Sequence, residues 1–562
     1  MKRLLALMLV VCLLAGCGAK EAAPAPETTA PTTVPETTET VVAESKLPED
    51  PAADDVTRIT LSDTGITVDG TDAQNAVYTS HDIIYYEDIE AYESGNPYGE
   101  GEEWERHSAE EAAEHTVVNI TAPGTYRIIG KLSKGQIRVD LGEGAYEDPD
   151  AVVELILNDL DITCTVAPAI LFLNVYECDG DWSVDTAKPD VDTAAAGANL
   201  VLEGINTVSG SHVAKIFKDN EEEKKLWKQD GAIYSYMSMN VSGTGKLDVT
   251  ADNEGLDTEL HLTINGGDIA IRSDNDGINT NEDGVSVTTI NGGNLHIIAG
   301  LGAEGDGIDS NGYLVINGGT VVASANPGAD AGMDSDLGSY IHGGTVIALG
   351  STMDWAESDS RQVTMNLQFA GNQSSDAAVV VTKTDGTVIF AYDPGSDEVL
   401  AENKRVYSGA VISCPNFQVG ENYHVFVDGE LTGEDVGGMY DASGVSAYSG
   451  GIQMAYTGTD VRMRPGGMGG MTPPEGFAGE RPEPPEGMEE MIPPEGFEGE
   501  RPEPPEGMEE MIPPEGFDGE RPEPPEGMES FDGFDSGTAG ETNAEFYMQD
   551  KVNFFSGLQS IQ

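Results

Sequence analysis

Basic residues are scarce in this 562-residue chain: 28 Lys and Arg stand against 100 Asp and Glu, a formal net charge of −72 at pH 7. Nucleic-acid-binding proteins need a cationic surface, and so do proteins that dock on anionic lipid head groups. The composition therefore predicts neither kind of partner. A chain this acidic suits divalent cations instead.

Cysteines and long apolar runs are also scarce after residue 17. Only Cys164, Cys178 and Cys414 remain there, so one disulfide at most could form, with one thiol left over. Cys164 and Cys178 are the nearer pair, and an exported protein would permit a bridge. The sequence leaves that pairing open. No later stretch is apolar enough to span a bilayer.

The N-terminus has the layout of an export signal. Lys2 and Arg3 precede an apolar run over 4–13, too short to cross about 30 Å of hydrocarbon, and Leu14-Ala15-Gly16-Cys17 follows. This order predicts a signal peptide over 1–16. The last four residues resemble the lipobox of bacterial lipoproteins, which implies acylation of Cys17 and anchoring to the cell membrane, exposed at the cell surface. A plain secretory signal that happens to carry a cysteine is the alternative.

Composition divides the rest of the chain into segments. Ala, Pro, Thr and Glu dominate the stretch after Cys17, which predicts a disordered spacer, and a Pro/Gly/Glu motif repeats every 20 residues near the C-terminus, which predicts an extended tail. Between them lie runs of short strands, with a helical patch near 109–114 and a loop at 182–193. The predicted segments are a spacer at 17–54, a mixed region at 55–116 with strands at 58–61 and 83–86, a repeat domain at 117–350, a smaller antiparallel β domain at 351–464, the tail at 465–530, and a strand segment at 531–562 that returns to the smaller β domain.

An internal repeat is the most informative feature of the sequence. Ile-Asn-Gly-Gly begins at Ile264, Ile290 and Ile316, and Ile-His-Gly-Gly begins at Ile341, at spacings of 26, 26 and 25 residues. A second motif of the Asp-Gly-Ile-x-Ser/Thr type recurs between these copies. Short strands and glycine turns at such a period are typical of a β-solenoid, because one turn cannot bury its own apolar residues but stacked turns can. A β-sandwich of irregular hairpins is the rival, but it gives no reason for the repeats.

Acids gather at the turns of this repeat. Residues 251–350 hold 15 Asp or Glu, Arg272 and no Lys. Equivalent positions on stacked strands lie about 4.8 Å apart, where two carboxylates repel by roughly 3.5 kcal/mol at an effective dielectric near 20. Calcium is the natural counter-ion, and a solvated acidic edge is the alternative. The predicted metal ligands are Asp252, Glu254, Asp257, Asp274, Asp276, Asn279, Asp283, Asp306, Asp309, Asp330, Asp334 and Asp336.

Catalytic motifs are incomplete. Asp306-Gly-Ile-Asp309 resembles a stretch of polygalacturonase-like hydrolases, but the Gly-His-Gly and Arg-x-Lys motifs of those enzymes are missing. A lyase needs a basic residue to remove a carbon-bound proton, and Arg272 is the one candidate in the main repeats. Two carboxylates could still act as acid and base in hydrolysis. No catalytic residue is predicted, and a lyase or hydrolase on pectin-like chains stays an alternative.

The stretch from Asp230 to Gly350 resembles the carbohydrate-binding β-helix family of clostridial cell surfaces. The resemblance rests on the two repeated motifs, the acidic turns and the upstream Pro123-Gly-Thr-Tyr126, and Ala331, Tyr234 and Asn279 depart from it. It implies an all-β, right-handed, pectate-lyase-like parallel β-helix that holds calcium at the turns and binds cellulose or polygalacturonate. A surface-anchored, calcium-dependent polysaccharide-binding lipoprotein is therefore the predicted function. An adhesin or wall-spanning scaffold is the structural alternative.

Overall fold

The computed structural model describes residues 56–86, 105–216, 227–459 and 542–561, apart from 74, 181, 396, 398, 401–404 and 441. The predicted signal peptide, Cys17, the spacer and the 465–530 tail lie outside the described residues. What is described is almost entirely β, apart from the short helix α1 (Ala109–Ala112), helical residues at Val399 and Leu400, and a 3₁₀ turn at Ala145–Glu147. In the described residues no helix is long and apolar enough to cross a membrane.

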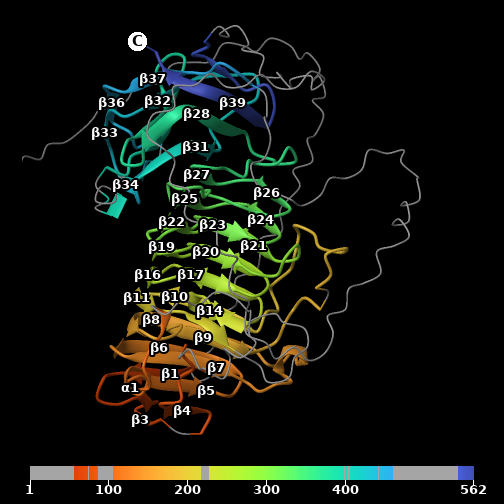
Figure 1. Cartoon of the computed structure of the whole chain (residues 1–562), viewed down its shortest axis with the longest axis vertical. Helices are drawn as coiled ribbons and strands as arrows, with labels where there is room; N and C mark the ends of the chain where they lie inside the picture. The colour runs from red at the N-terminus through yellow and green to blue at the C-terminus, as the bar shows by residue number, and fades with distance from the viewer. Residues whose placement is uncertain are drawn as a thin grey trace, which may run out of the picture. The chain divides into compact units, whose positions relative to one another are not determined.

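The second motif forms one face of the repeat. Its copies lie on short strands of an eight-stranded sheet in which every neighbouring pair is parallel except β4 and β5. Figure 1 shows β14, β17, β20 and β23 stacked in chain order. The strands of this sheet are β4 (Val77–Ser80), β5 (Thr116–Ile120), β7 (Gly135–Asp140), β9 (Ile170–Asn174), β14 (Gly231–Ser235), β17 (Glu254–Thr258), β20 (Ile278–Thr280) and β23 (Ile308–Ser310).

In each repeat, the strand that ends at the isoleucine of the Ile-Asn-Gly-Gly motif belongs to a second parallel ladder. Its members from β15 onward pair at the repeat spacing, with Ile264 opposite Ile290 and Ile290 opposite Ile316. Earlier strands continue the same ladder without the motif. The ladder contains β1 (Val56–Leu61), β6 (Gly124–Leu132), β8 (Val153–Thr163), β10 (Ala198–Glu203), β15 (Met239–Gly243), β18 (Leu262–Ile264), β21 (Val287–Ile290), β24 (Tyr313–Ile316) and β26 (Gly338–Ile341).

The strand after each Gly-Gly forms a third parallel ladder, which joins the second because the long strand β8 pairs with both β10 and β11. Each repeat between residues 231 and 324 thus gives one strand to each of three ladders, whereas the last repeat, over 331–350, gives strands only to the second and third. The third ladder contains β11 (Ile205–Gly210), β16 (Lys246–Ala251), β19 (Asp268–Ser273), β22 (Asn294–Ile298), β25 (Thr320–Ser324) and β27 (Thr345–Gly350).

Side-chain stacking explains the Ile-Asn-Gly-Gly motif. Its isoleucines are fully buried in the apolar core. The Asn291 side chain donates to that of Asn265 at 2.9 Å, and Asn317 donates to Asn291 at 2.9 Å. Gly293 has φ +92° and a Cβ there would lie 2.8 Å from the Gly267 oxygen of the previous repeat. Only glycine tolerates both conditions.

After Gly350 the pairing becomes antiparallel, except that β28 and β39 pair in parallel. β31 pairs with β27 on one side and with β28 on the other, so the sheet runs on from the repeats without a break. The strands are β28 (Thr364–Ser374), β29 (Val379–Lys383), β30 (Val388–Tyr392), β31 (Val406–Ser413), β32 (Asn422–Val427), β33 (Glu430–Thr432), β34 (Asp435–Val436), β35 (Met439–Tyr440), β36 (Ala447–Ser449), β37 (Ile452–Ala455), β38 (Phe546–Tyr547) and β39 (Val552–Ser560). Four small strands lie elsewhere: β2 (Thr67–Val68), β3 (Thr71–Asp72), β12 (Val213–Ile216) and β13 (Trp227–Gln229).

The return of the C-terminal segment is confirmed, because β39 pairs with β28 and β37. The buried side of this segment changes along its length, since Phe546 and Met548 are buried at its start. Residues 548–551 break the strand, so burial restarts on the other parity: Phe555 is buried, while Phe554 packs edge-on against Trp355.

The structure also decides two further points that the sequence raised, the strand at 83–86 and the cysteine pairing. Ile83–Tyr86 is not a strand. Its Ile83 and Tyr86 side chains are buried on irregular backbone, whereas Ile84 is exposed, and the Arg138 guanidinium donates to the adjacent Asp82 carbonyl at 3.1 Å. The possible pairing of Cys164 with Cys178 is resolved against a bridge, since Cys164, Cys178 and Cys414 are all free thiols.

Candidate metal centre

Strand register places the predicted acids in two columns on the eight-stranded sheet. Asp257 lies opposite Asn279, and Asn279 lies opposite Asp309. Glu254 occupies the position three residues before Asp257, and Asp276 and Asp306 occupy the same position in the next two repeats. Because parallel strands stack residues in register, the repeat itself brings these carboxyl groups together.

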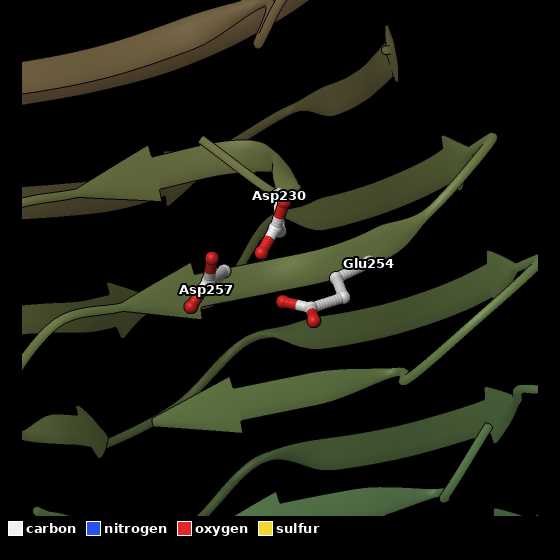
Figure 2. Close-up of side chains that lie close together, drawn as sticks. All are labelled: Asp230, Glu254 and Asp257. Atoms are coloured by element: carbon white, nitrogen blue, oxygen red, sulfur yellow. The ribbon is translucent and has the colours of Figure 1, made fainter. Parts of the chain in front are cut away.

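Within the described residues, two groups of three acids bring ligand oxygens within 4.8 Å of one another. The first, called the 230–257 cluster, is Asp230, Glu254 and Asp257. The second, called the 306–334 cluster, is Asp306, Asp309 and Asp334. Figure 2 shows the three carboxyl groups of the 230–257 cluster turned toward one another.

The 230–257 cluster is deeply buried, with Asp230, Glu254 and Asp257 4%, 2% and 0% exposed. Asn279 donates to Glu254 Oε1 at 3.0 Å, and Asn281 donates to Asp257 Oδ1 at 2.8 Å. The other oxygens, Glu254 Oε2 and Asp257 Oδ2, have no hydrogen-bond partner. Buried oxygens without donors are costly unless something else satisfies them.

Burial and mutual repulsion disfavour the charged forms of these acids. Burial, then the Asp230 charge, raises the pKa of Glu254 to about 7. Burial and Glu254 raise the pKa of Asp257 well above its usual range. Burial also raises the pKa of Asp230, although Lys228, whose Nζ lies 2.7 Å from Asp230 Oδ2, opposes that effect. Without a cation the cluster would carry protons near neutral pH.

The 306–334 cluster is less buried than the 230–257 cluster. Burial, more than neighbouring charge, raises the pKa of Asp306 to about 8, and burial followed by Asp334 raises the pKa of Asp309 to about 7. The Ala331 N–H donates to Asp306 Oδ1, and the Asp306 N–H donates to Asp276 Oδ1 at 2.6 Å. Backbone donors thus stabilise this cluster in part.

The remaining predicted ligands lie outside both clusters. Asp276 is in the column between them, and burial raises its pKa well above the usual range. Asp252 accepts from Ser211 at 2.6 Å and from His212 at 2.9 Å, and Asp330 accepts from the Gly305 N–H at 3.1 Å. Three more are exposed: Asp274, Asp283 and Asp336.

Sequence reasoning missed two residues here. Asp230 was not among the predicted ligands because its motif copy contains an extra residue: Gly231, not Asp230, pairs with Glu254. Lys228 corrects the expectation that no basic side chain is nearby. It reaches the acids from β13, whose pairing with β12 follows no repeat. Arg272, the basic candidate from the sequence, lies 3.8 Å from Asp397 instead.

The donor set fits a hard divalent cation. Calcium prefers six to eight carboxylate and carbonyl oxygens, and each cluster offers three carboxylates on adjacent strands. The unpartnered Glu254 Oε2, Asp257 Oδ2 and Asn279 Oδ1 supply further lone pairs with no competing donor. No cysteine belongs to either group, so the set lacks the soft ligands of a zinc site.

A cleft of about 300 Å³ opens beside the 230–257 cluster, lined by Lys228, Asp230, Glu254, Asp252 and His212 among others. His212 contacts Asp252 and, at 2.9 Å, Glu105. Burial lowers the pKa of His212, but Asp252 and Glu105 raise it more, to about 9. The cleft is therefore rich in carboxylates, and its two cationic side chains, Lys228 and His212, are both paired with acids.

Comparison with known proteins gives the following similarities. The family described as "Carbohydrate-binding domain-containing protein" matches residues 114–410. A carbohydrate-binding domain-containing protein of Acetivibrio thermocellus is 31% identical over 157 residues, which are 28% of this chain and 45% of that relative. The match thus spans less than half of the relative's length. A solved structure, the polysaccharide lyase-like protein from C. thermocellum as a gadolinium derivative, is 19% identical, with a TM-score of 0.29 over 51% of this chain and 92% of that chain.

Proposed function

We propose, because this chain belongs to the carbohydrate-binding domain-containing protein family, that it binds polysaccharide of the polygalacturonate or cellulose type at the cell surface. The observation that carries the proposal is the extent of the family match, since residues 114–410 include all three repeat ladders from β5 onward and both acid clusters. Carbohydrate binding is thus assigned to the repeat region rather than to a flanking segment.

The repeat region is proposed to be a right-handed parallel β-helix. Three parallel ladders at a period near 26 residues support this, as does one continuous core that includes the isoleucines of successive repeats. Stacked turns of this kind give an extended side on which a linear polymer can lie along successive strands.

Calcium is proposed as a structural or bridging ion. Asp230, Glu254 and Asp257 would hold one ion, and Asp306, Asp309 and Asp334 a second. Bound calcium would neutralise carboxylates whose burial otherwise keeps them protonated. A bridging ion would also let an acidic protein bind an anionic polyuronate.

Binding without cleavage fits the cleft better than catalysis does. Burial lowers the pKa of Lys228, but Asp230 and Glu254 raise it more, so it lies above its usual range. A lysine held protonated by two acids is a poor base for a lyase. Incubation with polygalacturonate, followed for reducing ends and unsaturated products, tests the enzyme alternative; either product would overturn the binding-only assignment.

A glycan array probed with and without chelator tests the binding proposal. We expect signal on polyuronate or β-glucan spots, with the polyuronate signal lost in chelator while circular dichroism shows the fold intact. Binding to no glycan would reject the proposal. Deletion of 465–530 tests the scaffold alternative, which predicts lost attachment with unchanged glycan binding.

The lipid anchor is a proposal from the sequence at Cys17. Cys17→Ser should prevent acylation, so the variant should leave the detergent phase into which the wild type partitions. Equal partitioning of the two proteins, with no lipid on the wild-type N-terminus, would reject the anchor.

A further inference from the structure

A second pocket, separate from both acid clusters, lies under the loop between β9 and β10. It has a volume of about 320 Å³ and is lined by Asp179, Lys188, Asp192, His261 and Val285 among others. This volume is at the small end of ligand pockets, which run from roughly 300 to 1,000 Å³. It suits one or two sugar rings rather than a folded partner.

The loop over this pocket is fixed at both ends. Glu177 accepts from the Ser238 N–H at 2.7 Å and from its hydroxyl at 2.9 Å. At the other end the Thr193 hydroxyl lies 2.8 Å from Asn240 Oδ1 and 2.7 Å from Thr263 Oγ1. Ser238 and Asn240 flank the start of β15, so the pocket is preformed on the strands of the second ladder.

His261 contributes a buried donor to the pocket wall. The residue is 1% exposed, and its Nδ1 accepts from the Val287 N–H at 3.1 Å. The neutral ring therefore carries its proton on Nε2, which has no well-aligned hydrogen-bond partner among the described residues. Asp179 Oδ2 lies 3.3 Å from this nitrogen. A donor and an acceptor side by side are what a single hydroxyl group, which both accepts and donates, satisfies.

An aromatic face adjoins these polar groups. Trp182 is 47% exposed and is not itself part of the lining, but its Nε1–H donates to the carbonyl of Asp179, a lining residue, at 2.6 Å, which holds the indole close to the pocket wall. Indole faces suit the apolar face of a pyranose ring. Among the charged residues that line the pocket, two are carboxylates (Asp179 and Asp192) and one is a lysine (Lys188), so the balance is negative. A uronate carboxylate would meet repulsion here that a neutral sugar avoids.

We infer that this pocket is a subsite for one neutral pyranose residue of a polysaccharide, with a sugar hydroxyl between His261 Nε2 and Asp179 Oδ2 and the ring against Trp182. The inference rests on the proposed function, since it names where and which sugar is bound. It assigns the neutral sugar to a site that needs no calcium, unlike the bridge proposed for polyuronates.

Calorimetric titration of the full chain with cellohexaose and with hexagalacturonate tests the subsite. We expect cellohexaose to bind in chelator under conditions where the fold is intact. Trp182→Ala should weaken that binding about tenfold, the equivalent of one lost stacking contact. His261→Asn keeps an acceptor for the Val287 N–H but removes the Nε2 donor, and should weaken binding about fivefold.

Tyr547→Ala is the matched control, because Tyr547 is a 49% exposed aromatic residue on β38, and it should leave cellohexaose binding unchanged. Unchanged affinity in both Trp182→Ala and His261→Asn would overturn the subsite while the proposed function stands. So would a wild type that binds hexagalacturonate but not cellohexaose. Binding of no oligosaccharide and no array glycan by the wild type would overturn both proposals.

Discussion

The two acid clusters differ in how the chain itself compensates their charge. The 230–257 cluster is fully buried and carries its own cation, because Lys228 pairs with Asp230. The 306–334 cluster is more exposed and relies on backbone donors such as the Ala331 N–H. A built-in lysine offsets part of the repulsion in the first cluster, so the second should depend more on an added cation.

The two clusters should therefore differ in how much their stability depends on a bound metal ion. A buried ion pair costs desolvation, and its removal leaves an uncompensated charge. Lys228 should therefore make the 230–257 cluster less dependent on a metal ion, whereas the 306–334 cluster should respond more steeply to calcium.

Removal of calcium should have the largest effect. An ion at about 100 times its dissociation constant stabilises the folded state by roughly 2.7 kcal/mol per site, so two sites give about 5 kcal/mol. Because the entropy of unfolding grows by roughly 2 cal/mol/K per residue, the Tm of a folded region of nearly 400 residues shifts by about 1 °C per kcal/mol, and chelator should lower it by about 5 °C. Calcium should restore it better than magnesium, which keeps its waters. An unchanged Tm by calorimetry would reject the structural ion.

Single substitutions, measured by the same calcium-dependent change in Tm, test the contrast between the two clusters. Asp309→Asn should blunt the calcium response of the Tm more than Asp257→Asn does, since Lys228 already offsets part of the charge near Asp257. Equal responses would show that the lysine does not distinguish the two clusters.

Metal-free protein should be less stable at high pH. Glu254 has a folded pKa of about 7 against an ordinary value of 4.5, and Asp306 about 8 against 3.8. A raised folded pKa gives stability that is fully present below the ordinary value and is lost as pH rises through the folded value. Between pH 5 and pH 8 the metal-free protein should lose about 3 kcal/mol, measured by urea unfolding. Glu254→Gln should flatten this slope, and with calcium bound the stabilisation should instead grow with pH.

The 26-residue period of the repeat explains which contacts the sequence could predict. The 26-residue spacing of Ile264, Ile290 and Ile316 predicted which residues stack, and the structure pairs them in that register. It also predicted that Asp257 and Asp309 share a column. Carbohydrate binding was predicted through the family resemblance, and a family described as a carbohydrate-binding domain-containing protein matches residues 114–410. The β-helix, the glycan, calcium and the anchor stay predictions.

Features that break the period could not be predicted this way. The extra residue that moves Asp230 out of the Glu254 column is visible only in the strand register. Lys228 comes from the β12–β13 hairpin, and the loop that places Trp182 beside Asp179 is an excursion between strands. A repeat pattern reports neighbours at equivalent positions, whereas these contacts join positions that are not equivalent.

Replacement of Lys228 should lower the free energy of unfolding less than loss of calcium does. Lys228→Met leaves Asp230 without its partner, and we expect a loss of about 2 kcal/mol in metal-free protein, less than a fully buried pair because the lysine is 37% exposed. With calcium the loss should shrink, because the cluster gains negative charge and binds the ion more tightly. Lys246→Met is the control, since its pair with Asp268 is exposed and long at 3.6 Å. Equal losses in both variants would contradict a special role for Lys228.

A single added carboxylate between the clusters should have the smallest effect on stability but the clearest effect on calcium. Asn279 separates Asp257 from Asp309 in the column and donates to Glu254 Oε1 at 3.0 Å and Asn281 Oδ1 at 3.1 Å. Asn279→Asp removes both donors and adds a charge, so metal-free protein should lose about 1 kcal/mol. Calcium binds carboxylate oxygens better than amide oxygens because they carry charge, so calorimetric titration should show tighter calcium binding at the 230–257 cluster. Asn265→Asp, in the exposed asparagine ladder, should change neither quantity, since its oxygen can still accept from Asn291. If Asn279→Asp left calcium binding unchanged, the column would not be a continuous metal-binding surface, and each cluster would have to be treated as isolated.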